Sequence, residues 1–261
     1  MRGNGEKLNY FIEGIQGAGK STLLQKLSEK LPAAGVYREG DYSPVDLAWC
    51  AYVTEEQYAG ILEKYAPIAD EIKKNTVPEG AHKVISYTRV LTDIPGFHKD
   101  LEQYEIYNGN RDRAAFEQIV LQRFQNWEGE DQIFECAFFQ NIVENEMLFF
   151  CLSDEEIMDL YRRVQRALSA KQFTVLYLEV ADIAEGIGII RRERSDEAGN
   201  ELWFPMMVRY LEESPYGKQN GLAGMEGLVA HLARRQALEL RILRELFPQE
   251  SRVMKAKGDE V

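Results

Sequence analysis

The chain has 261 residues, of which 45% are apolar, and its formal net charge at pH 7 is −12. This length allows one sizeable α/β domain with room for an inserted lobe. The negative charge argues against a nucleic-acid-binding surface, because phosphate backbones select basic faces, but a mononucleotide needs only local positive charge and is not excluded.

Residues that bind metals or form disulfides are scarce. Three cysteines and three histidines are too few and too scattered for a disulfide framework, a zinc cluster or a histidine metal site. The sequence contains no apolar run long enough to cross a bilayer, and its first residues do not resemble a signal peptide. These features predict a cytoplasmic protein with no membrane or nucleic-acid partner.

The first predicted elements are a strand at about 7–13 and a helix that runs to about Leu31. The apolar run of the strand enters a glycine-rich turn, and the residues after the turn place leucines at helical spacing. Four residues of the turn fit the phosphate-binding pattern GxxxxGK[ST]: Gly14, Gly19, Lys20 and Ser21. A strand before this pattern and a helix after it are the context that the pattern requires. The sequence therefore predicts a nucleotide-binding loop rather than a plain strand–turn–helix connection.

The chemistry of this loop follows from its residue types. Glycines let the backbone adopt positive φ and approach a ligand closely, so that successive N–H groups point inward and the next helix adds its positive end. In such loops the ammonium of Lys20 reaches the β- and γ-phosphates, and the hydroxyl of Ser21 ligates Mg²⁺. The predicted nucleotide-binding residues are Gly14, Gln16, Gly17, Ala18, Gly19, Lys20, Ser21 and Thr22.

A short strand is predicted at 36–38, and the polar segment after it carries candidate acceptor-binding residues. Glu39 and Asp41 follow the carboxyl end of this strand, where one of them can accept the proton of a substrate hydroxyl. Tyr42 and Trp49 can supply a stacking surface for a planar substrate. An ordinary acidic loop, with the tryptophan packed in a core, stays open as the alternative.

The middle of the chain is predicted to be mostly helical. Helical patterns cover 54–75 and 112–127. The segment 83–91 is compatible with a strand or a buried helix, because its periodicity does not decide between them. We interpret about 54–128 as a partly helical insertion in a single domain that covers 1–261.

A further strand is predicted at 132–139, and it carries one carboxylate, Glu135. The carboxyl ends of parallel strands face the ligand crevice of α/β proteins, and a lone acid there suits Mg²⁺, directly or through water. A solvated acid on an edge strand is the alternative, although a charge that closes such an apolar run costs desolvation free energy. Gln140, just beyond, can read the hydrogen-bonding edge of a base or sugar.

The last part of the chain supplies the remaining elements. The clearest strand is 173–180, and the helix after it leads into a basic cluster. Arg191 and Arg194 are predicted to close over bound phosphates as part of a mobile lid at about 191–200. A solvated helix end, where the helix dipole favours cations, is the alternative. The other predicted elements are helices at 154–168, 201–213 and 225–246, a glycine-rich loop at 217–224 and a short strand at 252–255.

Strands and helices alternate along the chain, and this order favours a parallel sheet with helices on both faces. We therefore predict an α/β fold, namely a three-layer αβα arrangement of the P-loop NTPase type. It should contain a parallel central sheet of about five strands, covered by helices on both faces, and a helical lid.

Four stretches of the chain resemble one family. Residues 11–22 are very similar to the phosphate loop of thymidylate kinases and of their relatives, the deoxynucleoside kinases. Residues 38–49 resemble the segment in which deoxynucleoside kinases carry a glutamate general base and a tryptophan of the substrate pocket. Residues 134–136 fall where these kinases carry Glu-Arg-Ser, and 191–194 fall where they carry an arginine-rich lid. Because Cys136 replaces the family's arginine, the resemblance is to a divergent branch.

The resemblance implies an ATP- and Mg²⁺-dependent phosphotransferase that moves the γ-phosphate to a nucleoside, a nucleotide or a similar small acceptor. On this expectation Lys20 binds the phosphates, Ser21 and Glu135 hold the metal, and Glu39 or Asp41 orients the acceptor. Two alternatives stay open: a nucleotide-dependent regulatory ATPase or switch, and an ATP-binding protein without kinase activity. The identity of the acceptor and the oligomeric state, a homodimer included, are left open by the sequence.

Overall fold

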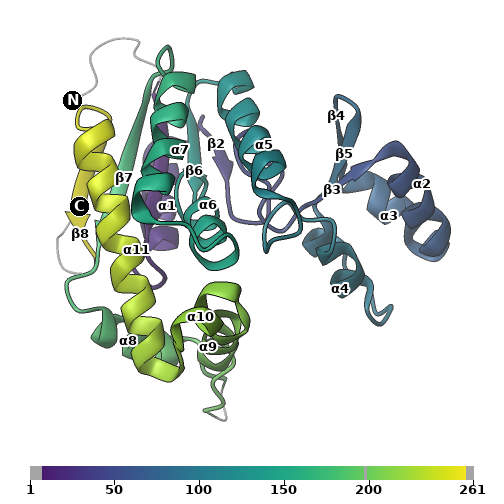
Figure 1. Cartoon of the computed structure of the whole chain (residues 1–261). Coiled ribbons are helices and arrows are strands. Elements are labelled where there is room, and N and C mark those ends of the chain that lie inside the picture. The colour runs from purple at the N-terminus through teal and green to yellow at the C-terminus, as the bar shows by residue number, and fades with distance from the viewer. Residues whose placement is uncertain (1–7, 197–198, 257–261) are drawn as a thin grey trace. The chain divides into compact units, whose positions relative to one another are not determined.

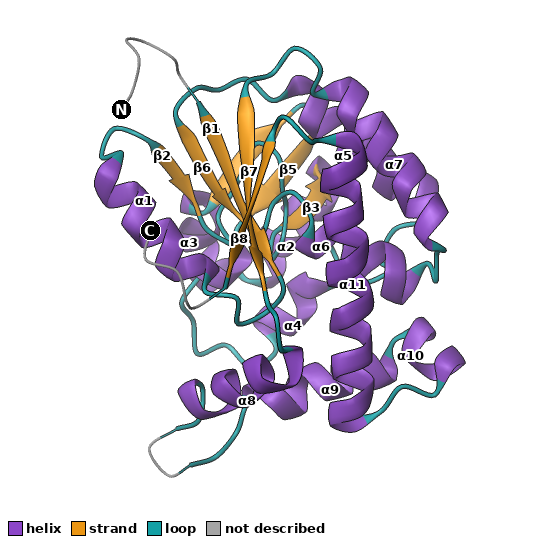
Figure 2. Cartoon of the chain, turned by 90° about the vertical axis from the view of Figure 1, so that its left-hand side faces the viewer, coloured by secondary structure: helices purple, strands orange, loops and turns teal. Residues whose placement is uncertain are grey.

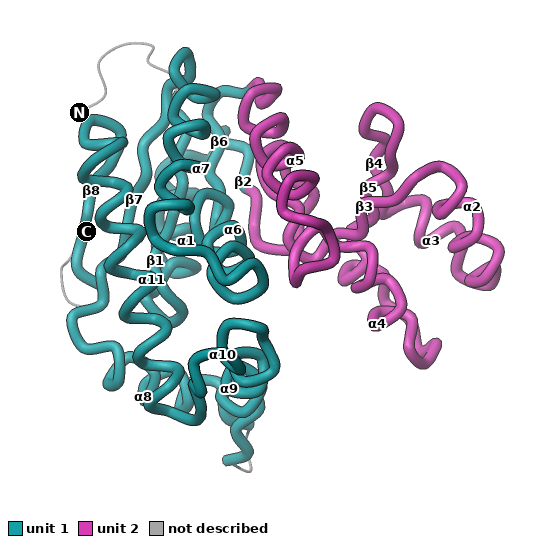
Figure 3. Tube along the Cα trace, in the orientation of Figure 1, with its two compact units in different colours: residues 1–36, 129–261 teal, residues 37–128 magenta. Residues whose placement is uncertain are grey.

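The computed structural model of the chain describes residues 8–196 and 199–256 (Figure 1). Contacts divide the chain into two compact units, which Figure 3 shows in different colours. Unit 1 consists of residues 1–36 and 129–261, and unit 2 consists of residues 37–128. Within the described residues, every helix is too short or too polar to cross a membrane.

The central sheet has five parallel strands, and this confirms the predicted α/β class. Strand β1 lies between β6 and β7, so that Phe11 is in register with Phe134 on one side and with Val175 on the other. Because the strands run parallel, their carboxyl ends meet at one edge of the sheet. In spatial order the strands are β2 (Gly35–Tyr37), β6 (Gln132–Glu135), β1 (Asn9–Gly14), β7 (Phe173–Glu179) and β8 (Ser251–Lys255).

Helices cover both faces of this sheet, as predicted (Figure 2). The chain first moves from β1 toward β2 and later passes to β7 and β8 on the other side, so right-handed connections place the helices on opposite faces. One face carries α1 (Lys20–Lys30), and the other carries α7 (Asp154–Ala167) and α11 (Gly224–Leu246). The other helices of unit 1 are α6 (Gln140–Glu144), the π-helix η3 (Asn145–Phe149), α8 (Ile183–Glu193), α9 (Trp203–Glu213) and α10 (Pro215–Asn220).

The alternation of side chains along β1 builds a different layer on each face of the sheet. Ile12 packs against Leu24 of α1 in an aliphatic cluster. The neighbours of Ile12 point to the opposite face, where Phe11 stacks on Phe134 with ring centroids 4.9 Å apart. Glu13 is on this second face as well, and it places a carboxyl group inside the protein.

Unit 2 contains a separate antiparallel sheet that the sequence did not predict. Its strands, in spatial order, are β3 (Ala51–Thr54), β5 (His82–Ile85) and β4 (Thr76–Glu79). The segment 83–91, which periodicity left undecided, forms the end of β5 and then the 3₁₀ turn η2 (Tyr87–Arg89). The strands are only four residues long, so each was too short to show a clear alternation in the sequence.

The helices of unit 2 follow the predicted pattern more closely. The expected helix at 54–75 is divided into α2 and α3 by a 3₁₀ turn that contains Pro67, and the expected helix at 112–127 is α5. The predicted insertion at about 54–128 lies within this unit. Its core includes Val53, Ile61 and Ile72. The helical elements are α2 (Glu55–Lys64), η1 (Ala66–Ile68), α3 (Ala69–Lys74), α4 (Phe97–Glu102) and α5 (Arg113–Asn126).

The predicted glycine-rich loop at 217–224 is wrong in its first part, because helix α10 occupies residues 215–220. Ser214 caps this helix: its side-chain oxygen accepts a hydrogen bond from the N–H of Gly217 at 2.9 Å. Pro215 stands at the first helical position, where its fixed φ favours helix. These two start signals outweigh the low helix propensity of Gly217.

The start of α7 gives a first testable prediction. Ser153 Oγ accepts from the N–H of Glu156 at 3.4 Å, and Glu156 Oε2 accepts from the N–H of Ser153 at 3.0 Å, which is the capping box that a Ser-x-x-Glu spacing favours. We expect Ser153→Ala to lower the free energy of unfolding by about 1 kcal/mol, because the N–H of Glu156 loses the side-chain oxygen that accepts its hydrogen bond. Urea unfolding followed by circular dichroism measures this change. Ser169→Ala, just beyond the other end of α7, is the control, and equal losses in the two variants would contradict the capping role.

Candidate functional site

The glycine-rich loop (residues 14–21) connects the carboxyl end of β1 to α1, and three of its glycines, Gly14, Gly17 and Gly19, have positive φ. Gly14 has φ +139° and Gly17 has φ +80°, values that residues with side chains rarely adopt. A Cβ atom at Gly14 would lie 2.6 Å from the carbonyl oxygen of Leu178, and one at Gly17 would lie 2.1 Å from Cδ1 of Ile190. The loop is therefore packed tightly between β7 and α8.

The side chain of Lys20 folds back onto this loop. Its Nζ donates to the carbonyl oxygens of Gly14 at 2.8 Å and Ile15 at 3.0 Å, and the residue is only 8% exposed. Lys20 is also the first residue of α1, a helix whose N-terminus is capped by no side chain of the described residues. The ammonium and the positive end of the helix dipole thus act at the same place, an arrangement that favours an anion.

A hydroxyl and a carboxylate meet beside the loop. Ser21 Oγ donates to Glu135 Oε1 at 2.5 Å. Glu135 is the last residue of β6 and is in register with Ile12, so parallel pairing brings it to the start of the loop. The structure thus brings the two predicted metal ligands together. Both are hard oxygen donors of the kind that Mg²⁺ prefers, and Mg²⁺ commonly takes its other ligands from phosphates and water.

The described residues contain no group of three or more His, Cys, Asp or Glu side chains that could hold a metal ion by themselves. A metal at Ser21 and Glu135 therefore depends on ligands that a bound nucleotide brings. The residues fit such a ligand in two ways: the uncapped N-terminus of α1 offers main-chain N–H groups, and Lys20 places a cation inside the curl.

Glu13 joins the loop region to the segment after β6, a role that the sequence analysis missed. This residue is completely buried. Its Oε1 accepts from the N–H of Phe138 at 2.6 Å, and its Oε2 accepts from the N–H of Gln140 at 3.4 Å. A lone carboxylate inside an otherwise apolar strand is the sequence signal that points to it. The predicted substrate-binding residue Gln140 thus begins α6 beside β1, with 7% of its surface exposed.

The two predicted lid arginines contact the segment at the start of α9. Arg191 Nε lies 2.9 Å from Glu201 Oε2. The guanidinium of Arg194 lies 5.6 Å from the ring centroid of Trp203. Residues 197–198 of the predicted lid lie outside the described residues. In this structure the arginines therefore pair with an acid and an aromatic ring of their own unit.

Glu39 and Asp41 lie in unit 2, directly after β2. Asp41 Oδ2 accepts from the N–H of Arg38 at 3.0 Å, and its Oδ1 accepts from Arg89. These contacts make the Asp41 carboxylate part of a turn, whereas Glu39 is exposed to solvent. Of the two candidate bases, Glu39 is therefore the one that a solvent-borne substrate reaches more readily.

The two aromatic residues of the same segment differ in their surroundings. Tyr42 OH donates to Glu79 at 3.2 Å, and the guanidinium of Arg123 lies 5.9 Å from the ring centroid of Tyr42 and pairs with Glu79. Trp49 is 47% exposed, so the alternative of a tryptophan packed in the core is wrong. An exposed indole retains its capacity to stack on a planar ligand.

Comparison with known proteins adds no identification. No protein-family model matches this chain, and no curated protein matches its sequence.

Glu13 gives a second testable prediction. Burial raises its pKa from 4.5 to about 8, and the nearby Glu239 adds to the rise. An acid whose folded-state pKa is raised contributes stability that is fully present below its unfolded-state pKa and is lost as the pH rises through the folded-state value. Relative to Glu13→Gln, which cannot ionise, the wild type should lose free energy of unfolding between pH 4.5 and about 8. Urea unfolding of both proteins across and above this range measures the difference.

The control for this experiment is Glu29→Gln, because Glu29 is an exposed residue of α1. Its stability curve should follow that of the wild type over the same range. A constant difference between wild type and Glu13→Gln at every pH would show that Glu13 does not titrate inside the protein.

Proposed function

We propose that this chain is an ATP- and Mg²⁺-dependent small-molecule kinase with a P-loop NTPase fold. The observation that carries the proposal is the ammonium of Lys20 inside the curl of residues 14–21, next to the Ser21–Glu135 pair. Ligands of open α/β sheets bind at the carboxyl edge where the strand order reverses, and β1 stands at that reversal. The resemblance of residues 11–22 to the phosphate loop of thymidylate kinases supports the same assignment.

The residues of unit 1 take separate roles in this proposal. Main-chain N–H groups of the loop and of the first turn of α1 bind phosphate oxygens. Lys20 exchanges the carbonyls of Gly14 and Ile15 for a phosphate oxygen, and this hydrogen bond is stronger because both partners are charged. Ser21 and Glu135 hold the magnesium ion. Bound MgATP supplies the phosphoryl group, and its metal offsets the negative charge of the phosphates.

The lid arginines complete the phosphate site. A guanidinium fork matches a phosphate as well as it matches a carboxylate, so Arg191 can exchange Glu201 for phosphate oxygens. Ile190, the residue before Arg191, packs closely on the loop at Gly17, and α8 therefore presents its last turn to the same region. Arg194 can likewise exchange its contact with the ring of Trp203 for phosphate oxygens.

The proposed acceptor is a small molecule with a hydroxyl or phosphate group, and the resemblance of residues 38–49 to deoxynucleoside kinases favours a nucleoside or nucleotide. Glu39 accepts the proton of the acceptor hydroxyl as the new bond to phosphorus forms. Trp49 supplies an exposed aromatic face for a base. Tyr42, Glu79 and Arg123 add hydrogen-bonding groups that are already oriented by one another.

The central test is nucleotide binding. We expect isothermal titration calorimetry to detect MgATP binding to the wild type, and Lys20→Ala to weaken it by about tenfold to a hundredfold, because one charge-assisted hydrogen bond is lost. Lys26→Ala is the control, since Lys26 is an exposed residue of the same helix. Equal affinities in the wild type and Lys20→Ala, or no binding heat for any triphosphate, would refute the proposal.

A second test addresses the reaction. The protein, incubated with labelled ATP and a panel of nucleosides, nucleotides and other alcohols, should transfer label to one acceptor class. We expect Glu39→Gln to lower kcat by about a hundredfold without weakening MgATP binding, because the lost group takes only the acceptor proton. Partner-dependent hydrolysis without a phosphorylated product would favour a regulatory ATPase, and binding with neither activity would favour an ATP-binding protein that lacks kinase chemistry.

A further inference from the structure

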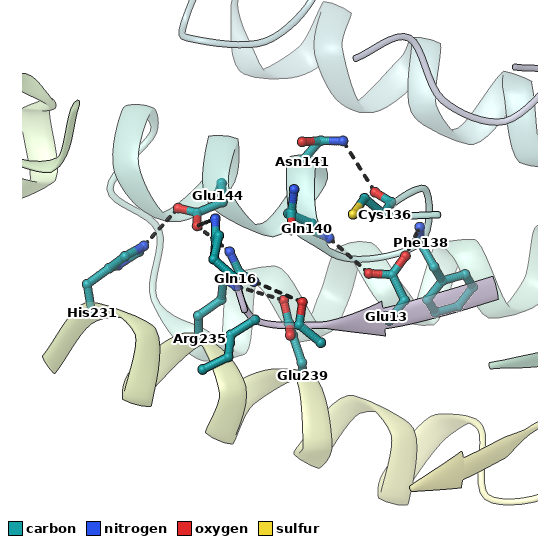
Figure 4. A network of polar contacts seen from close by, with 12 residues as sticks. Glu13, Gln16, Cys136, Phe138, Gln140, Asn141, Glu144, His231, Arg235 and Glu239 are labelled. Carbon is teal, nitrogen blue, oxygen red and sulfur yellow. Dashed lines mark hydrogen bonds and ion pairs between the residues drawn. The ribbon is translucent and has the colours of Figure 1, made fainter. Parts of the chain in front are cut away.

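A buried charged network joins α11 to α6 and β7 (Figure 4). Arg235 of α11 is completely buried and contacts two carboxylates: it pairs with Glu144 of α6, and its Nε lies 3.1 Å from Glu239, one turn further along α11. His231, one turn earlier, contacts Glu144 at 2.7 Å. Tyr177 of β7 donates to Glu239 at 2.6 Å. We refer to these five residues as the Arg235 network.

The Arg235 network contacts the glycine-rich loop at two points. Arg235 Nη2 donates to the carbonyl oxygen of Gly14 at 3.4 Å, and this is the same oxygen that accepts from Lys20. Gln16 Nε2 donates to Glu144 Oε1 at 3.5 Å. Figure 4 shows that the side chains of Gln16 and Arg235 converge on Glu144 from different elements. The start and the middle of the loop are therefore both tied to one buried ion pair.

Packing alone does not explain why α11 carries charges at this place. The buried face of α11 is otherwise mainly apolar and includes Leu228, Leu232, Leu238 and Ile242. Replacement of buried ion pairs by apolar residues of similar volume is often neutral or stabilising. The polar residues at 231, 235 and 239 are each four positions apart, so they form one stripe along the helix. This stripe contacts Glu144 and the glycine-rich loop. A role in holding the loop in place therefore explains the buried charges better than a contribution to stability.

The central ion pair is charged at neutral pH. Burial by itself raises the pKa of Glu144, but His231 and Arg235 outweigh it and lower the pKa to about 2. Burial by itself lowers the pKa of Arg235, because it disfavours the charged guanidinium. The carboxylates of Glu239 and Glu144 outweigh burial, and the pKa of Arg235 is raised. Glu144 and Arg235 therefore attract each other throughout the physiological range.

We infer that Arg235 and Glu144 are positioning residues, which hold Gly14 and Gln16 so that the loop keeps its anion-binding shape before a ligand arrives. This inference rests on the proposed function, because the ligand is taken to be a polyphosphate. Arg235 has no exposed surface, so it acts through the loop and does not touch the ligand. A loop that is already ordered binds more tightly, since binding then requires less ordering of the chain. Nucleotide affinity should therefore depend on α11, a helix near the other end of the sequence.

The first variant is Arg235→Lys, which keeps the charge but replaces a planar fork with a single ammonium that cannot serve Gly14 and both carboxylates. In the nucleotide-free protein we expect faster hydrogen exchange of the amides at 15–21, with exchange in β7 unchanged. Calorimetry should show MgATP binding weakened by about tenfold or more. Arg234→Lys, the next residue along α11, is the matched control, because Arg234 pairs with Asp154 at 2.7 Å, at the start of α7.

The second variant, Glu144→Gln, keeps the shape of the side chain but removes the charge that Arg235 and His231 face. It should accelerate exchange in the loop and weaken MgATP binding in the same way, and it decides the question if Arg235→Lys does not fold. The double variant should lose little more affinity than the stronger single variant, because both residues act through one contact.

If the folded variants and the wild type show the same hydrogen exchange at amides 15–21, the inference is overturned. This holds even when the wild type binds MgATP. Equal acceleration in the loop and in β7 would overturn it as well, because it would show a general loss of stability. Failure of the wild type to bind MgATP would instead refute the proposed function. In that case hydrogen exchange of the nucleotide-free protein still decides whether Arg235 and Glu144 position the loop.

Discussion

The main chain turns from β1 into α1 in a space that is bounded closely by Leu178 and Ile190. The carbonyl oxygen of Leu178 and the side chain of Ile190 leave no room for a side chain at Gly14 or Gly17. The turn is therefore made of nearly bare backbone, and Lys20 donates to its carbonyls from inside the curl. The candidate metal ligands Ser21 and Glu135 and the Arg235 network lie beside this one turn.

The two faces of the sheet support the turn by different means. On the α1 side an aliphatic cluster, which contains Ile12 and Leu24, holds strand and helix together by burial of apolar surface. On the α11 side the alternation of β1 places Glu13 near Glu239, which itself contacts Arg235. Charged groups in a dry interior require specific partners, so the polar contacts on the α11 side fix the positions of the groups that take part in them. The apolar cluster on the α1 side contributes mainly stability.

Unit 2 has its own sheet and its own core, and it carries the residues that we assign to the acceptor. Several carboxyl groups are buried in it with tyrosine partners: Tyr87 donates to Glu105, whose pKa burial raises to about 7, and Tyr107 donates to Asp46. Internal hydrogen bonds of this kind keep the chain between the strands ordered.

The sequence by itself determined the features that depend on residues close together in the chain. The loop at 14–21, the capping box at Ser153 and the strand at 173–180 all follow from local patterns, and so does the parallel sheet that their alternation predicts. Glu135 was also singled out in this way as a candidate, because a charge at the end of an apolar strand costs desolvation free energy.

Only the tertiary structure decided which distant groups meet. Asp41, which the sequence offered beside Glu39 as a candidate base, pairs in the fold with Arg89, 48 positions away, and Trp49 is exposed and not packed in a core. Arg235 reads as an ordinary charged residue of a long helix, yet it reaches the carbonyl of Gly14 across 221 positions. Such contacts produce no periodic or local pattern in the sequence. They form because helices and strands that are distant in the chain pack together, and a single sequence does not reveal which elements pack.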